Sequence, residues 1–381
     1  MKYYIIAGEA SGDLHGGNLI KELKQLDAAA HIRCWGGDKM EAAGATLVMH
    51  YRELAFMGFV EVIKNLHTIF RNLAFCKKDI TQYQPDALVL IDYPGFNLRM
   101  AEWAKQQGFK VIYYISPQVW AWKESRVKGI KKNVDKMLVI LPFETTFYKK
   151  WNYEVEYVGH PLVQVIDEFT GQYPALRIAG LKTTYSLLPD NNSPLIALLP
   201  GSRKQEILKK LPIMLDVAKN FPEYHFVVAK APGIEAGFYN ELLAPYHNVS
   251  SVINKTYHLL REAKAALVTS GTATLETALF GVPEVVCYKG NAISFQIAKR
   301  LVKIKYICLV NLIMDKEVVK ELIQDELTVE NITVELKKIL FDTGKQAKLE
   351  EDYTALRNLL SQGGNASANA AKSIYNYLAR H

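Results

Sequence analysis

Cysteine is scarce in this 381-residue sequence: there are four, and their spacing fits neither a disulfide framework nor a metal site. No apolar run is long enough to cross a bilayer. The apolar N-terminal run turns polar at Glu9 and is too short for a signal peptide. These absences predict a protein of the reducing cytoplasm that does not span a membrane.

Motifs of several enzyme classes are also absent. There is no P-loop, and the lack of a Gly-x-Ser-x-Gly elbow argues against a serine hydrolase. No Asp-x-Asp pair occurs, so a metal-bridged diphosphate is not indicated, and no metal or other cofactor is expected. The net charge of +7 is spread along the chain without a nucleic-acid-binding signature. It therefore favours a phosphorylated substrate or an anionic membrane surface over nucleic acid.

Short apolar runs alternate with helical stretches such as Leu14–Leu26 and Leu98–Gln107, which predicts an α/β protein with parallel sheets. The expected strands are Tyr3–Ala7, Ala87–Ile91, Val111–Ile115 and Met137–Leu141 in the first half, and Leu195–Leu199, His225–Ala229, Ala265–Thr269 and Glu284–Cys287 in the second. The two sets indicate two Rossmann-like domains that face each other across a cleft, with ligands at the carboxyl ends of the strands.

A less periodic stretch with Gly171 and Pro174 separates the two sets and predicts the domain junction. The expected division is an N-terminal domain over 1–165, a junction over 166–193, a C-terminal domain over 194–345, and helices over 346–381 that can pack back on the N-terminal domain.

One segment of the second set follows a strand and opens a helix. Ser270, Gly271, Thr272 and Thr274 lie where a helix N-terminus offers backbone N–H groups, hydroxyls and partial positive charge to a phosphate. Glu276, in the first turns, can accept hydrogen bonds from a ribose diol. A capped helix with a carboxylate that complements the helix dipole is an equal alternative.

A second strand end favours the phosphate reading. Ser202 and Arg203 follow Leu195–Leu199 and are expected at the same edge of the same sheet. Chance is much less expected to place groups suited to a diphosphate after two strands of one sheet than after a single strand.

Carboxylates follow two strands of the first half. Glu9, Ser11 and Asp13 belong to a glycine-bearing loop that lacks the G-x-G-x-x-G spacing, and its two carboxylates would repel a pyrophosphate. The loop suits sugar hydroxyls, or it is a tight turn with Asp13 as helix N-cap. Asp92 follows the strand Ala87–Ile91, where burial can raise the pKa of a general base; the alternative is a turn and helix N-cap.

Aromatic side chains suggest surfaces for sugar or acyl groups. Trp120 and Trp122, in a loop that begins at Ser116-Pro117, can form a flat apolar wall, although such pairs are more often core packing. His160 precedes a proline, and it is either structural or directed into the cleft. The segment Phe56–Phe75 is either a core helix or a surface for membrane and acyl chains.

The motifs GEASGD (8–13), SPQVWAW (116–122), LPGSR (199–203) and SGTATLE (270–276) stand in the order in which lipid-A-disaccharide synthases carry them. The chain resembles this family over nearly its whole length. The family belongs to the bilobal GT-B glycosyltransferases, which have two Rossmann-like domains.

The resemblance implies an inverting hexosyltransferase that needs no metal. It implies transfer of a diacylated glucosamine from UDP to a diacylated glucosamine 1-phosphate, which yields UDP and a β-1,6-linked precursor of lipid A, the anchor of lipopolysaccharide. The protein is then expected to be peripheral on the cytoplasmic face of the inner membrane of a Gram-negative bacterium, with a homodimer left open.

The resemblance also implies roles for single residues. Asp92 matches the family's essential aspartate, the proposed general base, and Arg203, Glu276 and Asn311 match residues of the UDP site. Gly95 stands where many members have a second carboxylate, which puts in doubt any mechanism that needs both. The N-terminal domain would hold the acceptor, and the C-terminal domain the UDP-sugar.

Two other functions stay open. A UDP-N-acetylglucosamine 2-epimerase has the same bilobal fold but needs no surface for acyl chains. A non-catalytic protein that binds sugar nucleotides or a lipid carrier would keep its affinity, with no turnover to lose, when Asp92 is replaced.

Overall fold

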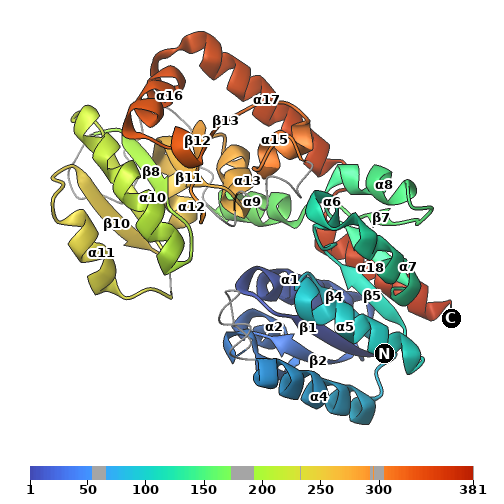
Figure 1. Ribbon diagram of the computed structural model, residues 1–381. Coiled ribbons are helices and arrows are strands. Elements are labelled where there is room, and N and C mark those ends of the chain that lie inside the picture. Colours follow the sequence, from blue (N-terminus) through green and yellow to red (C-terminus); the bar gives the residue numbers. More distant parts are fainter. Residues whose placement is uncertain (54–65, 173–192, 232, 292–294, 296–303, 381) are drawn as a thin grey trace. The chain divides into compact units, whose positions relative to one another are not determined.

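The computed structural model describes all residues except 54–65, 173–192, 232, 292–294, 296–303 and 381 (Figure 1). The chain divides into two compact units. The first comprises 1–161 together with 360–381, and the second comprises 162–359.

The first unit is built on a seven-stranded parallel sheet in the order β3-β2-β1-β4-β5-β6-β7. Its strands are β1 (Lys2–Ala7), β2 (His31–Gly36), β3 (Thr46–His50), β4 (Ala87–Ile91), β5 (Val111–Tyr114), β6 (Lys136–Val139) and β7 (Glu156–Tyr157). Its helices are α1 (Ala10–Leu26), α2 (Asp38–Ala42), α4 (Leu66–Tyr83), α5 (Pro94–Gln106), α6 (Val119–Trp122), α7 (Val127–Asn133), α8 (Pro142–Lys149) and α18 (Ala366–Ala379).

The side chains of the central strands alternate between two buried layers. Tyr4 and Ile6 of β1 enter one apolar cluster with residues of α4, α5 and α7, while Tyr3 and Ile5 enter another with residues of α1 and α18. Helices therefore cover both faces of the sheet, which explains why its central strands are continuous apolar runs.

The second unit contains a six-stranded parallel sheet in the order β10-β9-β8-β11-β12-β13. Its strands are β8 (Leu195–Leu199), β9 (His225–Lys230), β10 (Val249–Ile253), β11 (Ala263–Thr269), β12 (Glu284–Tyr288) and β13 (Lys320–Ile323). Its helices are α9 (Pro161–Gln172, which starts at the unit boundary), α10 (Lys204–Val217), α11 (Ala236–Leu243), α12 (Thr256–Glu262), α13 (Thr272–Leu279), α15 (Leu309–Met314), α16 (Val329–Phe341) and α17 (Thr343–Ser361, which ends in the first unit).

The predicted α/β fold with two parallel sheets is confirmed, and all eight expected strands are present. Five further strands have no counterpart in the prediction: β2, β3, β7, β10 and β13. Four of them are the sheet edges, where a strand has one neighbour and keeps polar residues, so its sequence lacks a continuous apolar run.

Two local expectations were wrong. The first helix begins at Ala10 rather than Leu14, and Glu9 is its N-cap, so Asp13 lies within the helix and does not cap it. Residues 166–172 were expected to belong to a less periodic junction but form the second half of α9, because Gly171 stands in the last turn, where it interrupts little.

Candidate active site

Each sheet reverses its strand order at one point. In the first unit this point lies between β1 and β4, and in the second between β8 and β11. The loops after these strands diverge there, and open α/β sheets bind ligands in the crevice that results. Glu9 and Asp92 follow β1 and β4, while Arg203 and Ser270 follow β8 and β11. The sequence-predicted residues therefore lie at both reversal points.

The backbone at Asp92 is held in an unusual conformation. Asp92 and Tyr93 both have positive φ, at 44° and 50°. The Asp92 carbonyl oxygen accepts hydrogen bonds from Asn97 Nδ2 at 2.8 Å and from the Tyr113 hydroxyl at 2.5 Å. A Cβ at Gly8 would stand 2.3 Å from the Tyr93 ring, so only glycine fits beside this turn. Strain of this kind clusters at functional sites.

The environment of Asp92 suits a base. Burial, and secondly the neighbouring Glu9 carboxylate, raise the pKa of Asp92 to about 6, while a backbone hydrogen bond at Tyr93 opposes them. A carboxyl with this pKa is ionised at neutral pH, yet it holds a proton more strongly than an ordinary aspartate.

The other candidates of the first loop differ in their environment. Ser11 is exposed and Glu9 is partly exposed. Asp13 is buried, and its carboxylate accepts hydrogen bonds from the backbone N–H groups of Gly37, Lys39 and Met40 at 2.8–3.1 Å. Asp13 therefore caps α2 across the fold, which is neither the sugar contact nor the cap of its own helix that the sequence suggested.

The tryptophan loop is held by a carboxyl that the sequence reading missed. The Trp120 indole N–H donates to Glu144 Oε1 at 3.3 Å, and its ring packs edge-on against Phe143 at 5.0 Å. Burial raises the pKa of Glu144 to about 7, against hydrogen bonds that lower it. Trp122 ends α6, and its side chain lies outside the described residues.

His160 is buried in the first unit. Burial, and secondly the neighbouring His15, lower the pKa of His160 to about 3. The imidazole is therefore neutral at pH 7 and binds protons too weakly to be an effective base.

Four predicted residues of the second unit are exposed: Ser202, Arg203, Gly271 and Thr272. Gly201 and Gly271 have φ of 110° and 142°, which lets both turns leave the sheet sharply. The Arg203 guanidinium is 3.2 Å from Glu206 Oε1. A guanidinium and the first N–H groups of α13 thus follow adjacent strands, an arrangement that suits a diphosphate.

Two hydroxyls that were predicted to bind phosphate donate instead to backbone carbonyls of the turn that follows β11 and of its surroundings. Ser270 Oγ donates to the carbonyl of Ile307 at 2.9 Å, and Thr274 Oγ1 donates to the carbonyl of Gly271 at 2.8 Å. Thr274 is buried, so it shapes the turn from within.

Glu276 is partly exposed on α13, where it is paired with Tyr257, a residue that the sequence reading missed. The Tyr257 hydroxyl donates to Glu276 Oε1 at 2.8 Å. Burial raises the pKa of Glu276, and the bond from Tyr257 opposes this. Tyr257 therefore orients the carboxylate, whose remaining acceptor capacity suits a diol.

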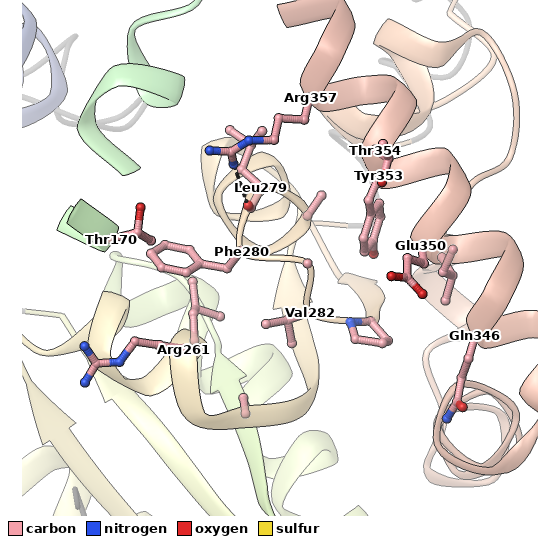
Figure 2. A pocket seen from close by; sticks show the side chains of 16 residues that line it. Thr170, Arg261, Leu279, Phe280, Val282, Gln346, Glu350, Tyr353, Thr354 and Arg357 are labelled. Atoms are coloured by element: carbon pink, nitrogen blue, oxygen red, sulfur yellow. Dashed lines mark hydrogen bonds between the residues drawn. The ribbon is translucent and has the colours of Figure 1, made fainter. Parts of the chain in front are cut away.

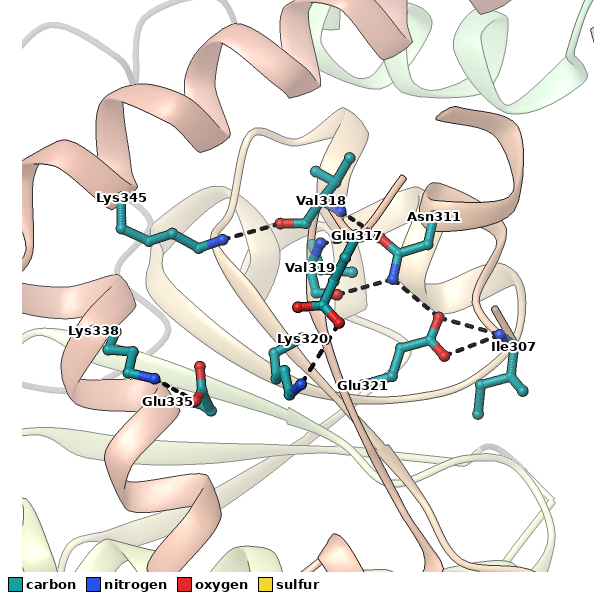
Figure 3. A network of polar contacts seen from close by, with 10 residues as sticks. All are labelled: Ile307, Asn311, Glu317, Val318, Val319, Lys320, Glu321, Glu335, Lys338 and Lys345. Carbon is teal, nitrogen blue, oxygen red and sulfur yellow. Dashed lines mark hydrogen bonds and ion pairs between the residues drawn. The ribbon is translucent and has the colours of Figure 1, made fainter. Parts of the chain in front are cut away.

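Asn311 is fully buried in a polar network (Figure 3). Its Nδ2 donates to the Val319 carbonyl at 2.9 Å and to Glu321 Oε1 at 3.0 Å, and its Oδ1 accepts from the N–H groups of Val318 and Val319 at 2.8 and 3.0 Å. These four bonds use the whole hydrogen-bonding capacity of the amide.

Glu321 links Asn311 to the turn that follows β11. Its carboxylate accepts from the Ile307 N–H at 3.0 Å, and the Ile307 carbonyl accepts from Ser270. In the described conformation, Asn311 therefore acts on the turn through Glu321 and Ile307 instead of presenting a free amide to UDP.

A cavity of about 680 Å³ lies at the amino ends of the strands of the second sheet, opposite the carboxyl ends where the candidate site lies (Figure 2). It is lined by Ala263, which begins β11, by Pro283, which precedes β12, and by Phe280 and Tyr353. Since β11 has seven residues, this edge is about 20 Å from Ser270. The cavity is therefore distinct from the candidate site.

Within the described ranges, no three His, Cys, Asp or Glu side chains are grouped to hold a metal ion. The helices described there include none that is long and apolar enough to cross a membrane.

Three comparisons identify what the chain is similar to. The family model of lipid-A-disaccharide synthetase matches residues 3–375. A lipid-A-disaccharide synthase of Geobacter metallireducens is 40% identical over 365 residues, which cover 94% of this chain and 93% of that protein. A lipid-A-disaccharide synthase of Coxiella burnetii is 37% identical over 378 residues, 98% of each chain.

Among solved structures, the UDP-GlcNAc 2-epimerase of Neisseria meningitidis, bound to UDP-GlcNAc, has a TM-score of 0.67 at 14% identity, with full coverage of both chains. At this identity the likeness shows the fold alone, the GT-B arrangement that glycosyltransferases and epimerases share.

Proposed function

Because this chain belongs to the lipid-A-disaccharide synthase family, a family of hexosyltransferases, we propose that its two units divide the transfer of a diacylated glucosamine between them. The second unit binds UDP-2,3-diacylglucosamine, and the first binds 2,3-diacylglucosamine 1-phosphate. The observation that carries this division is that the general-base candidate follows β4 and the diphosphate candidates follow β8 and β11, at the reversal points of the two sheets.

In the proposed donor site, Arg203 and the N–H groups that begin α13 bind the diphosphate, with Ser202 and Thr272 beside them. Glu276, oriented by Tyr257, accepts the ribose hydroxyls. These donors stabilise the charge that grows on the diphosphate as the bond from C1 of the sugar breaks. The same residues bind UDP while it is part of the donor substrate and after it has been released from the sugar.

In the proposed acceptor site, Asp92 takes the proton of the acceptor 6-hydroxyl. The oxygen attacks C1 of the donor sugar opposite the diphosphate, the C1–O bond to UDP breaks, and the configuration at C1 inverts. One base is enough for a single displacement, which agrees with Gly95 in place of a second carboxylate.

The decisive experiment is to incubate the purified protein with both lipid substrates. UDP release together with a lipid disaccharide is expected. If UDP-GlcNAc is instead converted to its C2 epimer and no disaccharide forms, the epimerase alternative holds. If the nucleotide binds without turnover of any kind, the protein is a non-catalytic binding protein.

Turnover is expected not to depend on a divalent metal, because a guanidinium and a helix N-terminus supply the positive charge at the diphosphate. EDTA should leave the rate of UDP release unchanged. A loss of activity in EDTA that magnesium restores would contradict this expectation.

Attachment to an anionic membrane surface is proposed for α4. Leu73, Cys76 and Ile80 of this helix join the core, so part of the helix is core as the first alternative had it. Phe70 is nevertheless 62% exposed, next to the exposed Arg71. Phe59 and the rest of 54–65 lie outside the described residues.

Phe70→Ser is expected to weaken binding to vesicles of anionic phospholipid by about 30-fold, because about 2 kcal/mol of apolar transfer is lost when an inserted aromatic ring is removed. Vesicle co-sedimentation measures this. Phe341→Ser is the matched control, since Phe341 is 59% exposed on α16. Equal vesicle binding by the wild type and both variants would contradict the proposal that α4 contacts the membrane.

A further inference from the structure

Lys210 is a buried lysine that the proposed mechanism does not use. It stands on α10, and its side chain is 3% exposed. Lysine is almost never this buried without a specific partner. Its position three residues after Ile207 and four before Met214 places it in the buried stripe of the helix, where an apolar residue is expected.

The Lys210 ammonium lies between the two turns of the proposed donor site. It donates to the hydroxyl of Thr269, which ends β11 immediately before Ser270. It also lies 3.6 Å from the point where a Cβ at Gly201 would stand. One side chain thus contacts the last residue of β11 and lies beneath the turn that follows β8.

Glu206 lies between two cations at the start of α10: Arg203, the N-cap of the helix, and Lys210. Glu206 is 3.2 Å from Arg203 and 3.9 Å from Lys210. Arg203 and Glu206 alone would be a neutral pair, so Lys210 makes the group net positive by one charge. Burial lowers the pKa of Lys210, while the Glu206 carboxylate opposes this. The buried charge is also less screened by solvent than the exposed guanidinium.

We propose that Lys210 is a positioning residue for the diphosphate of the sugar nucleotide, since it ties the turn after β8 to the end of β11 and keeps positive charge beneath both. The inference rests on the donor site proposed above. It assigns Lys210 no contact with the reacting atoms. Because the charge of Lys210 lies beneath the turns proposed to hold the diphosphate, replacing Lys210 should weaken a ligand more as its number of phosphate groups increases. The uridine part of the ligand should not matter.

The test compares uridine, UMP and UDP as ligands of the full-length protein by isothermal titration calorimetry. Lys210→Met should raise the Kd of UDP by about 10–100-fold, the usual worth of a charge-assisted contact, raise that of UMP less, and leave that of uridine within about two-fold. Lys210→Arg should recover part of the UDP affinity. Lys209→Met is the control, because Lys209 is the exposed neighbour with the same charge.

A variant that binds UDP as the wild type does, or that loses UDP and uridine equally, overturns the role of Lys210. A wild-type protein that binds no UDP overturns the donor site itself, so the two failures are distinguishable. If Lys210→Met does not fold, Thr269→Val decides instead: it should weaken UDP more than uridine, and an unchanged ratio overturns the proposal.

Discussion

Asp92→Asn is expected to lower kcat by about 10²–10⁴-fold, the usual worth of general base catalysis, while the Kd of UDP stays unchanged. The amide keeps the shape of the carboxylate but cannot take the proton of the acceptor hydroxyl. The hydrogen bonds from Asn97 and Tyr113 go to the backbone carbonyl of residue 92, so the turn should survive the substitution.

The pH dependence gives this prediction a second measurement. A base must be deprotonated to act, so kcat/KM of the wild type should fall as pH drops through about 6, the pKa to which Asp92 is raised. Glu9→Gln removes the carboxylate that contributes to this rise, so the fall should move to lower pH. The acidic limb should be missing from the residual activity of Asp92→Asn.

The rival bases are Glu9, Asp13 and His160. His160 has its pKa lowered to about 3, and Asp13 is engaged by three backbone N–H groups, which leaves Glu9 as the main rival. If Asp92→Asn keeps most of its turnover and Glu9→Gln abolishes it, the base is Glu9.

The positions of the candidate residues were predictable because the strands before them are buried on both faces. Leu195–Leu199 and Ala87–Ile91 are continuous apolar runs that end abruptly, the first at Pro200 and Gly201 and the second at Asp92, so the sequence marks both the strand and the point where its loop begins. The edge strands lack a continuous apolar run of this kind. Contacts between side chains that are distant in the sequence leave no local pattern either. Tyr257 and Glu276 are an example of the latter, because nothing local requires that hydroxyl to meet that carboxylate.

Roles were less predictable than positions. Asp13 on α1 and Asn311 on α15 are polar residues, but both are buried and bonded mainly to backbone groups outside their own helices. A polar residue that binds a ligand and one that satisfies buried backbone groups look alike in sequence. Lys210 carried a readable signal, a charge within the apolar stripe of its helix, but only the fold shows that Thr269 is its partner.

Arg203→Ala is expected to reduce kcat/KM by roughly 30–700-fold, which corresponds to about 2–4 kcal/mol, by analogy with the loss of one oxyanion donor. Arg203 is 58% exposed and paired with Glu206 at 3.2 Å, so a diphosphate must compete with that carboxylate for the guanidinium. Arg203→Lys keeps the charge but loses the two-pronged geometry, and its activity should fall between those of the wild type and Arg203→Ala.

Glu206→Gln tests the same contact between Arg203 and the diphosphate, and it should change the Kd of UDP in the opposite direction. Glu206→Gln removes one carboxylate that competes with the diphosphate for the guanidinium, so the Kd of UDP should decrease in Glu206→Gln and increase in Arg203→Ala. Both shifts should shrink as salt is added, because the pair is exposed. Lys209→Ala, on the exposed side of the same helix, should change neither constant. An Arg203→Ala variant within a few-fold of the wild type in kcat/KM would place the diphosphate away from the end of β8, and the donor site would then rest on α13 alone.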